Sequence, residues 1–235
     1  MPLSVQHVQR DDLPRILDIF CTSMSSISLL VATGDIPNLE NLDEASAATA
    51  REHAIARFAE ILDSYPKVHF LKAVDAENGD IAAFAIWYFF SGPDGVADWK
   101  AYVETGDRLR VPVGCDIEAY RYGWSKIHEN YQEVFGEGRE HFHLGLLATH
   151  PGHERRGAGS KLLNWALEQA DEKGLECHLE GTPTGYPLYS RKGFVDAFGK
   201  GNSLLDFDVS KYTGKEGDLV DLTAMVRPPQ KRSQR

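Results

Sequence analysis

The feature that most constrains the fold is a strand, a glycine turn and a helix that follow one another without interruption in the second half of the chain. The run "HFHLGLLAT" (residues 141–149) predicts a strand, and "HPGHERRGAGS" follows it as a turn. Apolar residues at helical spacing then predict an amphipathic helix that reaches Ala170, and "LECHLEG" (residues 175–181) predicts another strand. Strand, helix and strand in this order indicate a β-α-β unit.

The rest of the chain predicts a hairpin and several helices. Two strand-like runs, residues 67–74 and 81–90, are separated by Asn78-Gly79, a strong hairpin signal. The second run is apolar throughout, which is typical of a strand buried on both faces. Asp11 and Asp12 precede an apolar stripe at helical spacing and predict a helix start. Further elements are expected as a strand at 3–8, a helix around 55–62, a short helix within 185–194, and strands at 203–209 and 219–225.

This order of elements indicates an α+β fold. With 235 residues, the chain is long enough for one large domain. We assign residues 1–226 to a single domain, and residues 227–235, which are polar, basic and rich in proline, to a solvated tail. Residues 91–140 hold glycine- and proline-containing segments around helical patches rich in tyrosine and tryptophan. We interpret them as an insertion that lies over the core.

Composition and charge argue against several classes of protein. The formal net charge of -10 argues against nucleic-acid binding, which usually leaves a basic footprint. The longest apolar run, residues 81–90, is about half of the roughly 20 residues that a membrane-spanning helix needs. Cys21, Cys115 and Cys177 show neither zinc-binding spacing nor a paired framework, which fits a reducing compartment. We therefore expect a cytoplasmic protein without a metal or a membrane segment, whose oligomeric state the sequence does not determine.

The glycine turn itself predicts an anion site. Gly157 and Gly159 stand at the start of the helix, where each glycine is unfavourable by about 0.5–1 kcal/mol relative to alanine. A helix N-terminus carries N–H groups without partners and a partial positive charge, so it binds phosphate. Arg155 and Arg156 add positive charge beside it. On spacing alone, an ordinary N-terminal turn explains the same residues equally well.

With its neighbours, this turn resembles the signature of the GNAT superfamily of N-acetyltransferases, Gln/Arg-x-x-Gly-x-Gly/Ala after a strand and a proline-containing turn. The first signature position is Glu154 here, and the two glycines are in register. "PLYSRKGF" (residues 187–194) is similar to the family's "LYxxxGF" segment, with Tyr189 in place. The matched segments cover residues 142–195. The resemblance implies the acyl-CoA N-acyltransferase fold, with a central mixed, mostly antiparallel sheet and flanking helices.

The resemblance also implies a site for acetyl-CoA as co-substrate, with no metal. In the family, the strand before the turn splays away from its neighbour, and its free backbone groups pair with the pantetheine arm of the coenzyme. By position, those groups belong to Leu147, Ala148 and Thr149. The residues implied to hold the diphosphate are Arg155, Arg156, Gly157, Ala158, Gly159 and Ser160.

The candidate catalytic residues follow from the same resemblance. Tyr189 matches the family's tyrosine near the thioester sulfur, where a phenol donates a proton to the leaving thiolate. His143 is a candidate general base that acts through water on the attacking amine, and Glu180, at the end of the next strand, is its rival. A packed aromatic ring and a structural strand histidine remain the alternative interpretations of Tyr189 and His143. The asparagine that the family often has before the tyrosine is missing here.

Together these residues predict an acetyl-CoA-dependent N-acetyltransferase. It would move an acetyl group to a primary amine by direct attack in a ternary complex, with a small molecule as the acceptor. Two other functions remain open at this point. One is a non-catalytic acyl-CoA-binding sensor or interaction module, and the other is a protein or peptide N-acetyltransferase.

Overall fold

The computed structural model describes residues 3–24, 43–64, 67–105, 117–199 and 204–230, and Cys115 lies outside this part. Its described strands form one sheet in the order β1-β2-β3-β4-β5-β8-β6, with β7 also pairing with β8. Only β4 and β5 pair in parallel among the described strands, which confirms the α+β class and the mixed, mostly antiparallel sheet. The strands are β1 (Leu3–His7), β2 (Val68–Asp75), β3 (Ile81–Phe90), β4 (His141–Thr149), β5 (Glu176–Gly181), β6 (Val195–Asp196), β7 (Leu204–Asp208) and β8 (Leu219–Arg227).

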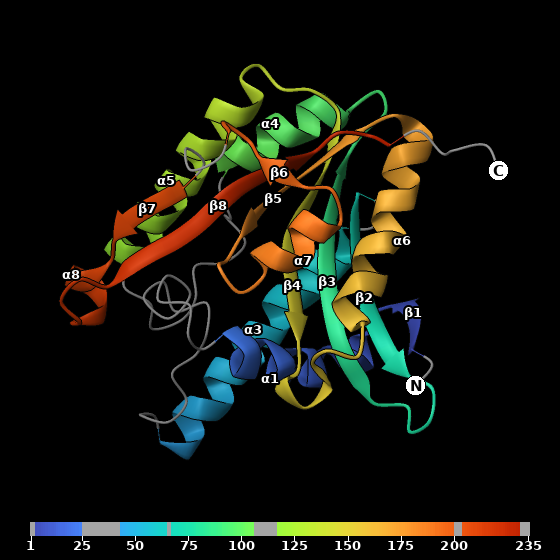
Figure 1. Cartoon of the computed structure of the whole chain (residues 1–235). Helices are drawn as coiled ribbons and strands as arrows, with labels where there is room; N and C mark the ends of the chain where they lie inside the picture. The colour runs from blue at the N-terminus through green and yellow to red at the C-terminus, as the bar shows by residue number, and fades with distance from the viewer. Residues whose placement is uncertain (1–2, 25–42, 65–66, 106–116, 200–203, 231–235) are drawn as a thin grey trace.

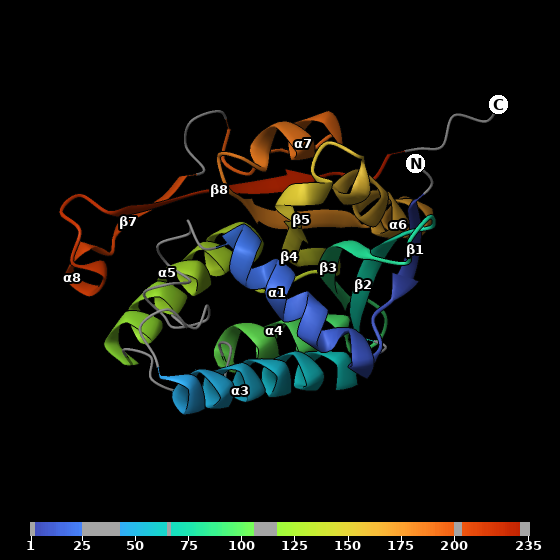
Figure 2. The ribbon, with the colours of Figure 1, turned by 90° about the horizontal axis from the view of Figure 1, so that it is seen from below.

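Helices cover both faces of the sheet, as Figures 1 and 2 show. One face carries α6 (Ala158–Lys173) and α7 (Tyr186–Arg191), and the other carries α1 (Leu13–Met24), α3 (Glu44–Asp63), α4 (Gly95–Thr105) and α5 (Ile117–Phe135). A short α8 (Ser210–Thr213) joins β7 to β8. None of the described helices is long and apolar enough to cross a membrane.

Each face of the sheet is sealed by its own apolar core. The α6 face buries Phe142, Leu162 and Leu163 completely, and the α1 and α3 face buries Ile16 and Phe84 completely. The hairpin expected around Asn78-Gly79 is confirmed, because β2 and β3 pair in antiparallel. The apolar run of residues 81–90 forms β3, which lies between β2 and β4 with helices covering both faces.

The segment 91–140, interpreted above as an insertion, contributes α4 and α5. These helices pack on the sheet through a third apolar cluster that contains Trp99, Tyr131 and Phe135 together with Val220 of β8. Gly138 has a φ of 94°, and a Cβ there would lie 2.7 Å from the ring of Trp99. The described part of this segment thus covers one face of the sheet in the region where β4 and β5 pair. Its status as an insertion stays a prediction.

The feature that positions the site is the divergence of β4 from β5. The two strands pair from His141–Glu176 to Leu144–Leu179 and no further, although β4 continues to Thr149. At the same point the β3–β4 register shifts, so that a bulge leaves Gly145 without a partner on β3. A Cβ at Gly145 would lie 2.6 Å from the ring of Tyr88, so the bulge needs glycine. We call the resulting gap between β4 and β5 the fork.

The C-terminal end of β8 is tied to α6 by a buried ion pair. Arg227, which composition places in the solvated tail, is the last residue of β8 and is 3% exposed. Its guanidinium donates two hydrogen bonds to the carboxylate of Asp171, at 2.7 and 2.8 Å, and a third to the carbonyl of Lys192. The backbone N–H of Gln230 also donates to Asp171. The packed part of the chain therefore extends beyond residue 226, the domain boundary that composition suggests. The bidentate ion pair stabilises this end, since it neutralises a charge that would be unfavourable if it were buried alone.

We expect Arg227→Ala to lower the free energy of unfolding by about 3 kcal/mol, because it leaves the Asp171 carboxylate buried without its partner. Urea unfolding followed by circular dichroism measures this loss. Arg10→Ala is the matched control, since the ion pair of Arg10 with Asp63 is about 60% exposed on both sides and is expected to contribute less than about 1 kcal/mol. Equal losses in the two variants would contradict this account of the β8 end.

Candidate active site

A cavity of about 550 Å³ opens at the fork. Its walls come from the end of α1, the second half of β4, the loop between β5 and α7, and the first half of β8. Leu147 and Tyr189 are among the lining residues, and the charged side chains among the described ones are those of Glu154 and Asp221. The cavity therefore joins mostly apolar walls to two carboxylates.

The open edge of β4 offers backbone hydrogen-bonding groups to this cavity. The N–H of His150 donates to the carbonyl of Ala82 on β3, and the register places Ala148 opposite Phe84. Because backbone groups alternate in direction along a strand, those of Ala148 face β3, whereas those of Leu147 and Thr149 face the fork. The carbonyl of Thr149 accepts a hydrogen bond from the hydroxyl of Ser23 on α1, at 2.8 Å. Of the three β4 residues expected to pair with a ligand, Leu147 and Thr149 thus present their main chain, and Ala148 contributes only to the wall.

The glycine turn lies next to the cavity, because a Cβ on Gly159 would lie 3.2 Å from Leu188 and 3.7 Å from Leu147, which both line it. Gly157 is the N-cap of α6 with a φ of 85°, a left-handed conformation that is accessible to glycine at no steric cost. Arg155 also has a positive φ, of 59°. No side chain caps α6, so the amides of Ala158, Gly159 and Ser160 lack partners within the helix. These amides are free donors at the positive end of a helix, which is the arrangement that an anion site needs, and the site itself stays a prediction.

The arginine beside this turn is held by the β2–β3 hairpin. Arg156 donates to Asp75 at the end of β2, and Asp75 is 2% exposed. The hydrogen bond from Arg156 holds the pKa of the Asp75 carboxyl below its usual value. Arg156 also contacts Nδ1 of His153 at 2.7 Å, while Nε2 of His153 lies 2.9 Å from Asp80. The Arg156 side chain therefore anchors the turn to the sheet, a role that the sequence does not reveal because Asp75 is 81 residues away.

Tyr189 lies on α7 and lines the cavity at the fork. The loop before α7 is fixed by Thr182, whose hydroxyl accepts a hydrogen bond from the N–H of Gly185 at 3.1 Å. A Cβ on Gly185 would lie 2.7 Å from the Tyr189 ring, so glycine lets the ring pack against this loop. Tyr189 is 8% exposed, and burial raises the pKa of its hydroxyl above the usual value. The phenol therefore stays protonated at neutral pH, as a proton donor must.

His143 and Glu180, the two candidate bases, belong to one buried polar cluster at the base of the fork. His143 pairs in register with His178 on β5, and Glu180 lies two residues further along the same face. Nε2 of His143 is 3.0 Å from the hydroxyl of Tyr131, and the Nδ1 atoms of His143 and His178 are 3.2 Å apart. Asn130 donates to Glu180 at 3.2 Å. The sequence does not predict these contacts, because they join β4 and β5 to each other and to α5.

Burial governs the protonation of this cluster. It lowers the pKa of His143 to about 3, with a smaller contribution from His141, and it lowers that of His178 well below the usual value. Burial raises the pKa of Glu180 to about 8, against hydrogen bonds from Tyr131 and Asn130 that favour the charged form. Both imidazoles are therefore neutral at neutral pH. His143 is 2% exposed with both ring nitrogens engaged, whereas the side chain of Glu180 keeps 11% of its surface exposed.

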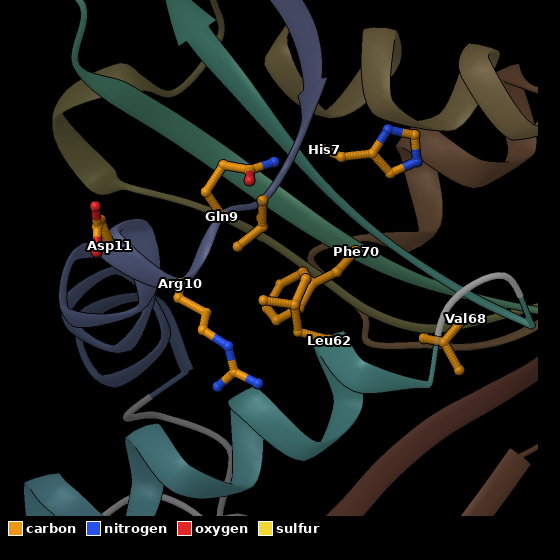
Figure 3. Close-up of a pocket in the computed structure, with 8 residues that line it drawn as sticks. His7, Gln9, Arg10, Asp11, Leu62, Val68 and Phe70 are labelled. Carbon is orange, nitrogen blue, oxygen red and sulfur yellow. The ribbon is translucent and has the colours of Figure 1, made fainter.

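A second hollow, of about 590 Å³, lies at the other edge of the sheet, where β1 meets α3 (Figure 3). Phe70 and Leu62 form its apolar wall, and the side chains of His7 and Arg10 point away from one another. Arg10 is paired with Asp63, and His7 contacts His69. No cluster of reactive groups converges on this hollow among the described residues that line it, so the fork remains the candidate active site.

Comparison with known proteins places these features in a family. Residues 39–194 match the model of a family described as the acetyltransferase (GNAT) family. No curated protein matches the chain by sequence.

Solved structures share the fold over nearly the whole chain. A structure from Corynebacterium glutamicum, described as histone acetyltransferase HPA2 and related acetyltransferase, is 21% identical, covers 99% of both chains and has a TM-score of 0.57. Arylalkylamine N-acetyltransferase 2 from Aedes aegypti is 11% identical, with 98% of this chain and 100% of that chain covered and a TM-score of 0.61. The mosquito arylalkylamine N-acetyltransferase like 5b is 13% identical, with 97% and 100% covered and a TM-score of 0.58. At these identities the likeness shows the fold alone.

Proposed function

The chain belongs to the acetyltransferase (GNAT) family, and from that premise we propose that it is an acetyl-CoA-dependent N-acetyltransferase whose acceptor is a primary amine of a small molecule. The observation that carries the proposal is the arrangement of the fork. Helix amides without partners in α6 lie near the end of β4, the end of β4 and Tyr189 line the cavity, and Glu180 lies one residue beyond the last position at which β4 and β5 pair. Acetyl-CoA needs donors for its diphosphate and backbone groups for its pantetheine arm. Its reaction with an amine needs a proton donor and a base near the thioester.

Acetyl-CoA would bind along the fork through the main chain. Its diphosphate would accept hydrogen bonds from the amides of residues 158–160, with the exposed side chain of Arg155 beside it. The amide-rich pantetheine arm would pair with the main chain of Leu147 and with the backbone N–H of Thr149, whose carbonyl already accepts from Ser23, as an added strand does at a sheet edge. Arg156 would contribute its backbone and the shape of the turn, because its side chain is engaged with Asp75.

Acetyl transfer would proceed by direct attack of a neutral amine on the thioester carbonyl. The new C–N bond forms, the C–S bond breaks, and the sulfur leaves as a thiolate that takes the proton of the Tyr189 hydroxyl. No covalent intermediate on the enzyme is needed. Cys177 is buried on the opposite side of β5 from the polar cluster, and burial raises the pKa of its thiol to about 12, so it is unsuited to act as a nucleophile.

The proton of the attacking amine would go to Glu180 rather than to His143. Both ring nitrogens of His143 face hydrogen-bonding partners, and the ring is almost fully enclosed. The Glu180 carboxylate lies one residue beyond the last paired position of the two strands, where the fork begins, and part of its side chain remains exposed. We therefore assign His143 to the support of the cluster and Glu180 to proton transfer.

A small cationic amine suits the cavity better than an acidic acceptor. The described lining residues that carry charge, Glu154 and Asp221, are both anionic, and most of the remaining wall is apolar. The volume of about 550 Å³ is in the range of small-molecule sites. Turnover of peptide amines with no turnover of small amines would favour the protein acetyltransferase instead. Tight acetyl-CoA binding without turnover of any amine would favour the acyl-CoA sensor.

We expect Tyr189→Phe to lower kcat for acetyl transfer about 100-fold, because it removes the proton donor to the leaving thiolate. Release of free coenzyme A thiol, measured with a panel of primary amines, gives the rate. The dissociation constant for acetyl-CoA, measured by calorimetry, is expected to stay within about twofold, since the ring that lines the cavity is retained. A variant with the wild-type kcat would show that Tyr189 is only a packed aromatic residue.

We expect Glu180→Gln to lower kcat about 100-fold, since the amide accepts no proton from the amine. His143→Gln is the comparison variant. It disturbs the cluster yet leaves the carboxylate in place, so a loss of less than about tenfold is expected. The same assay serves both variants, with thermal unfolding as a check on folding. The assignment is wrong if the His143 variant loses more activity than the Glu180 variant.

We expect Asp75→Asn to weaken coenzyme A binding about tenfold, or by about 1.4 kcal/mol. Simple electrostatics predicts tighter binding when a negative charge near an anion site is removed. We expect weaker binding instead. The reason is that Arg156 loses its anchor and the turn loses its fixed shape. Isothermal titration with coenzyme A measures the change. Asp63→Asn removes the same charge at the far edge of the sheet and is expected to change nothing. Tighter binding by the Asp75 variant would contradict the anchoring role.

A further inference from the structure

The polar cluster at the base of the fork gathers three residues of the types that bind transition metals. His143, His178 and Glu180 each offer one ligand atom, and these atoms all lie within 4.8 Å of one another. His178 and Glu180 are two residues apart on β5, and His143 lies directly across on β4, so all three side chains leave the same face of the sheet. Two imidazole nitrogens and a carboxylate oxygen are a common ligand set for zinc.

The surroundings of these residues hold them as metal ligands are usually held. Metal-binding histidines generally use one ring nitrogen for the metal and hydrogen-bond the other to a neighbour. His143 has this arrangement, because its Nε2 faces the Tyr131 hydroxyl at 3.0 Å while its Nδ1 points to His178. Asn130 donates to one oxygen of Glu180 at 3.2 Å. Both supporting side chains come from α5, and both are buried.

One atom in the cluster has no satisfactory partner. The ring of His178 is completely buried, and its Nε2 makes no hydrogen bond. That atom lies 3.4 Å from Oε1 of Glu180, which is within the distance of an ion pair, but the contact lacks the geometry of a hydrogen bond. In the described part of the chain, no lysine or arginine forms an ion pair with Glu180. A buried imidazole nitrogen without a hydrogen bond is thus left beside the carboxyl group of Glu180, an arrangement that is unfavourable in an apolar interior.

We propose that His143, His178 and Glu180 form a binding site for a divalent transition metal ion of the zinc class. Zinc accepts nitrogen and oxygen donors together, binds three protein ligands and leaves a fourth position for water or another ligand. A bound cation would favour the charged form of the Glu180 carboxyl group, which burial disfavours, and would give the buried ring of His178 a partner. No spacing rule reveals this site in the sequence, because His143 and His178 are 35 residues apart and meet only through the parallel pairing of β4 and β5.

The consequence for catalysis rests on the proposed function. A metal ion coordinated by Glu180 occupies the oxygen lone pair that accepts the proton of the amine. Bound zinc therefore inhibits acetyl transfer, and a chelator restores it. The site itself does not depend on that function, since it follows from the three ligands and their surroundings.

The test is metal binding by the full-length chain after treatment with a chelator and buffer exchange. Titration calorimetry with Zn²⁺, in the absence of coenzyme and amine, is expected to give one site per chain. His178→Gln is expected to weaken this binding on the order of 100-fold. The control is His69→Gln, which disrupts the other close histidine pair, whose His7 Nε2 and His69 Nδ1 atoms are 3.3 Å apart. This control is expected to bind zinc as the wild type does.

Two further measurements keep the outcome clear. Co²⁺ added to the metal-free wild type is expected to give the visible absorption of a low-coordinate site with nitrogen and oxygen ligands, which needs no variant. If His178→Gln does not fold, Glu180→Gln replaces it, with the same expected loss of zinc binding. Unchanged zinc binding in a folded cluster variant, its loss in His69→Gln, or no site in the wild type would each overturn the proposal.

Acetyl transfer by the metal-free enzyme separates this proposal from the proposed function. One zinc site without turnover of any amine, with or without chelator, rejects the function and supports the site. Turnover that is indifferent to zinc, together with no zinc binding in calorimetry, rejects the site and supports the function.

Discussion

The parallel pairing of β4 with β5, and its abrupt end after Leu144 and Leu179, is the constraint on which the rest of the structure depends. Parallel pairing brings His143 beside His178, and its end opens the edge of β4 to the cavity. The bulge at Gly145 turns β4 away from its neighbour without breaking its pairing with β3. The parallel pairing of β4 with β5 therefore creates the polar cluster, and the end of this pairing opens the cavity.

The sheet keeps these polar groups in place because apolar cores surround them. The α6 core seals one face, while α4 and α5 cover the other and supply Tyr131 and Asn130 to the cluster. Low polarity around the cluster strengthens the hydrogen bonds that are made and raises the free energy of groups that lack a partner. The apolar surroundings that stabilise the fold thus also set the protonation of the cluster.

The sequence predicts the parts of the fold and site that depend on local requirements. Gly157 needs a left-handed conformation and Tyr189 follows a short helix start, so both are visible from neighbouring residues. The hairpin at Asn78-Gly79 is local in the same sense. The partners of the site residues are not local. Arg156 meets Asp75, and Glu180 meets Asn130, across 81 and 50 residues of chain, and no spacing pattern encodes such contacts. For the same reason, composition alone places Arg227 in a tail although an ion pair buries it.

The position of β8 in the sheet has a consequence for the order of assembly. This strand pairs with β5, β6 and β7, yet it begins at Leu219, well after β5 ends at Gly181. During synthesis, β5 therefore leaves the ribosome long before the strand that covers its second edge, and that unpaired edge is exposed to chaperones and to other nascent chains. One wall of the fork comes from β8, so the cleft is complete only after residues 219–222 have been translated and packed.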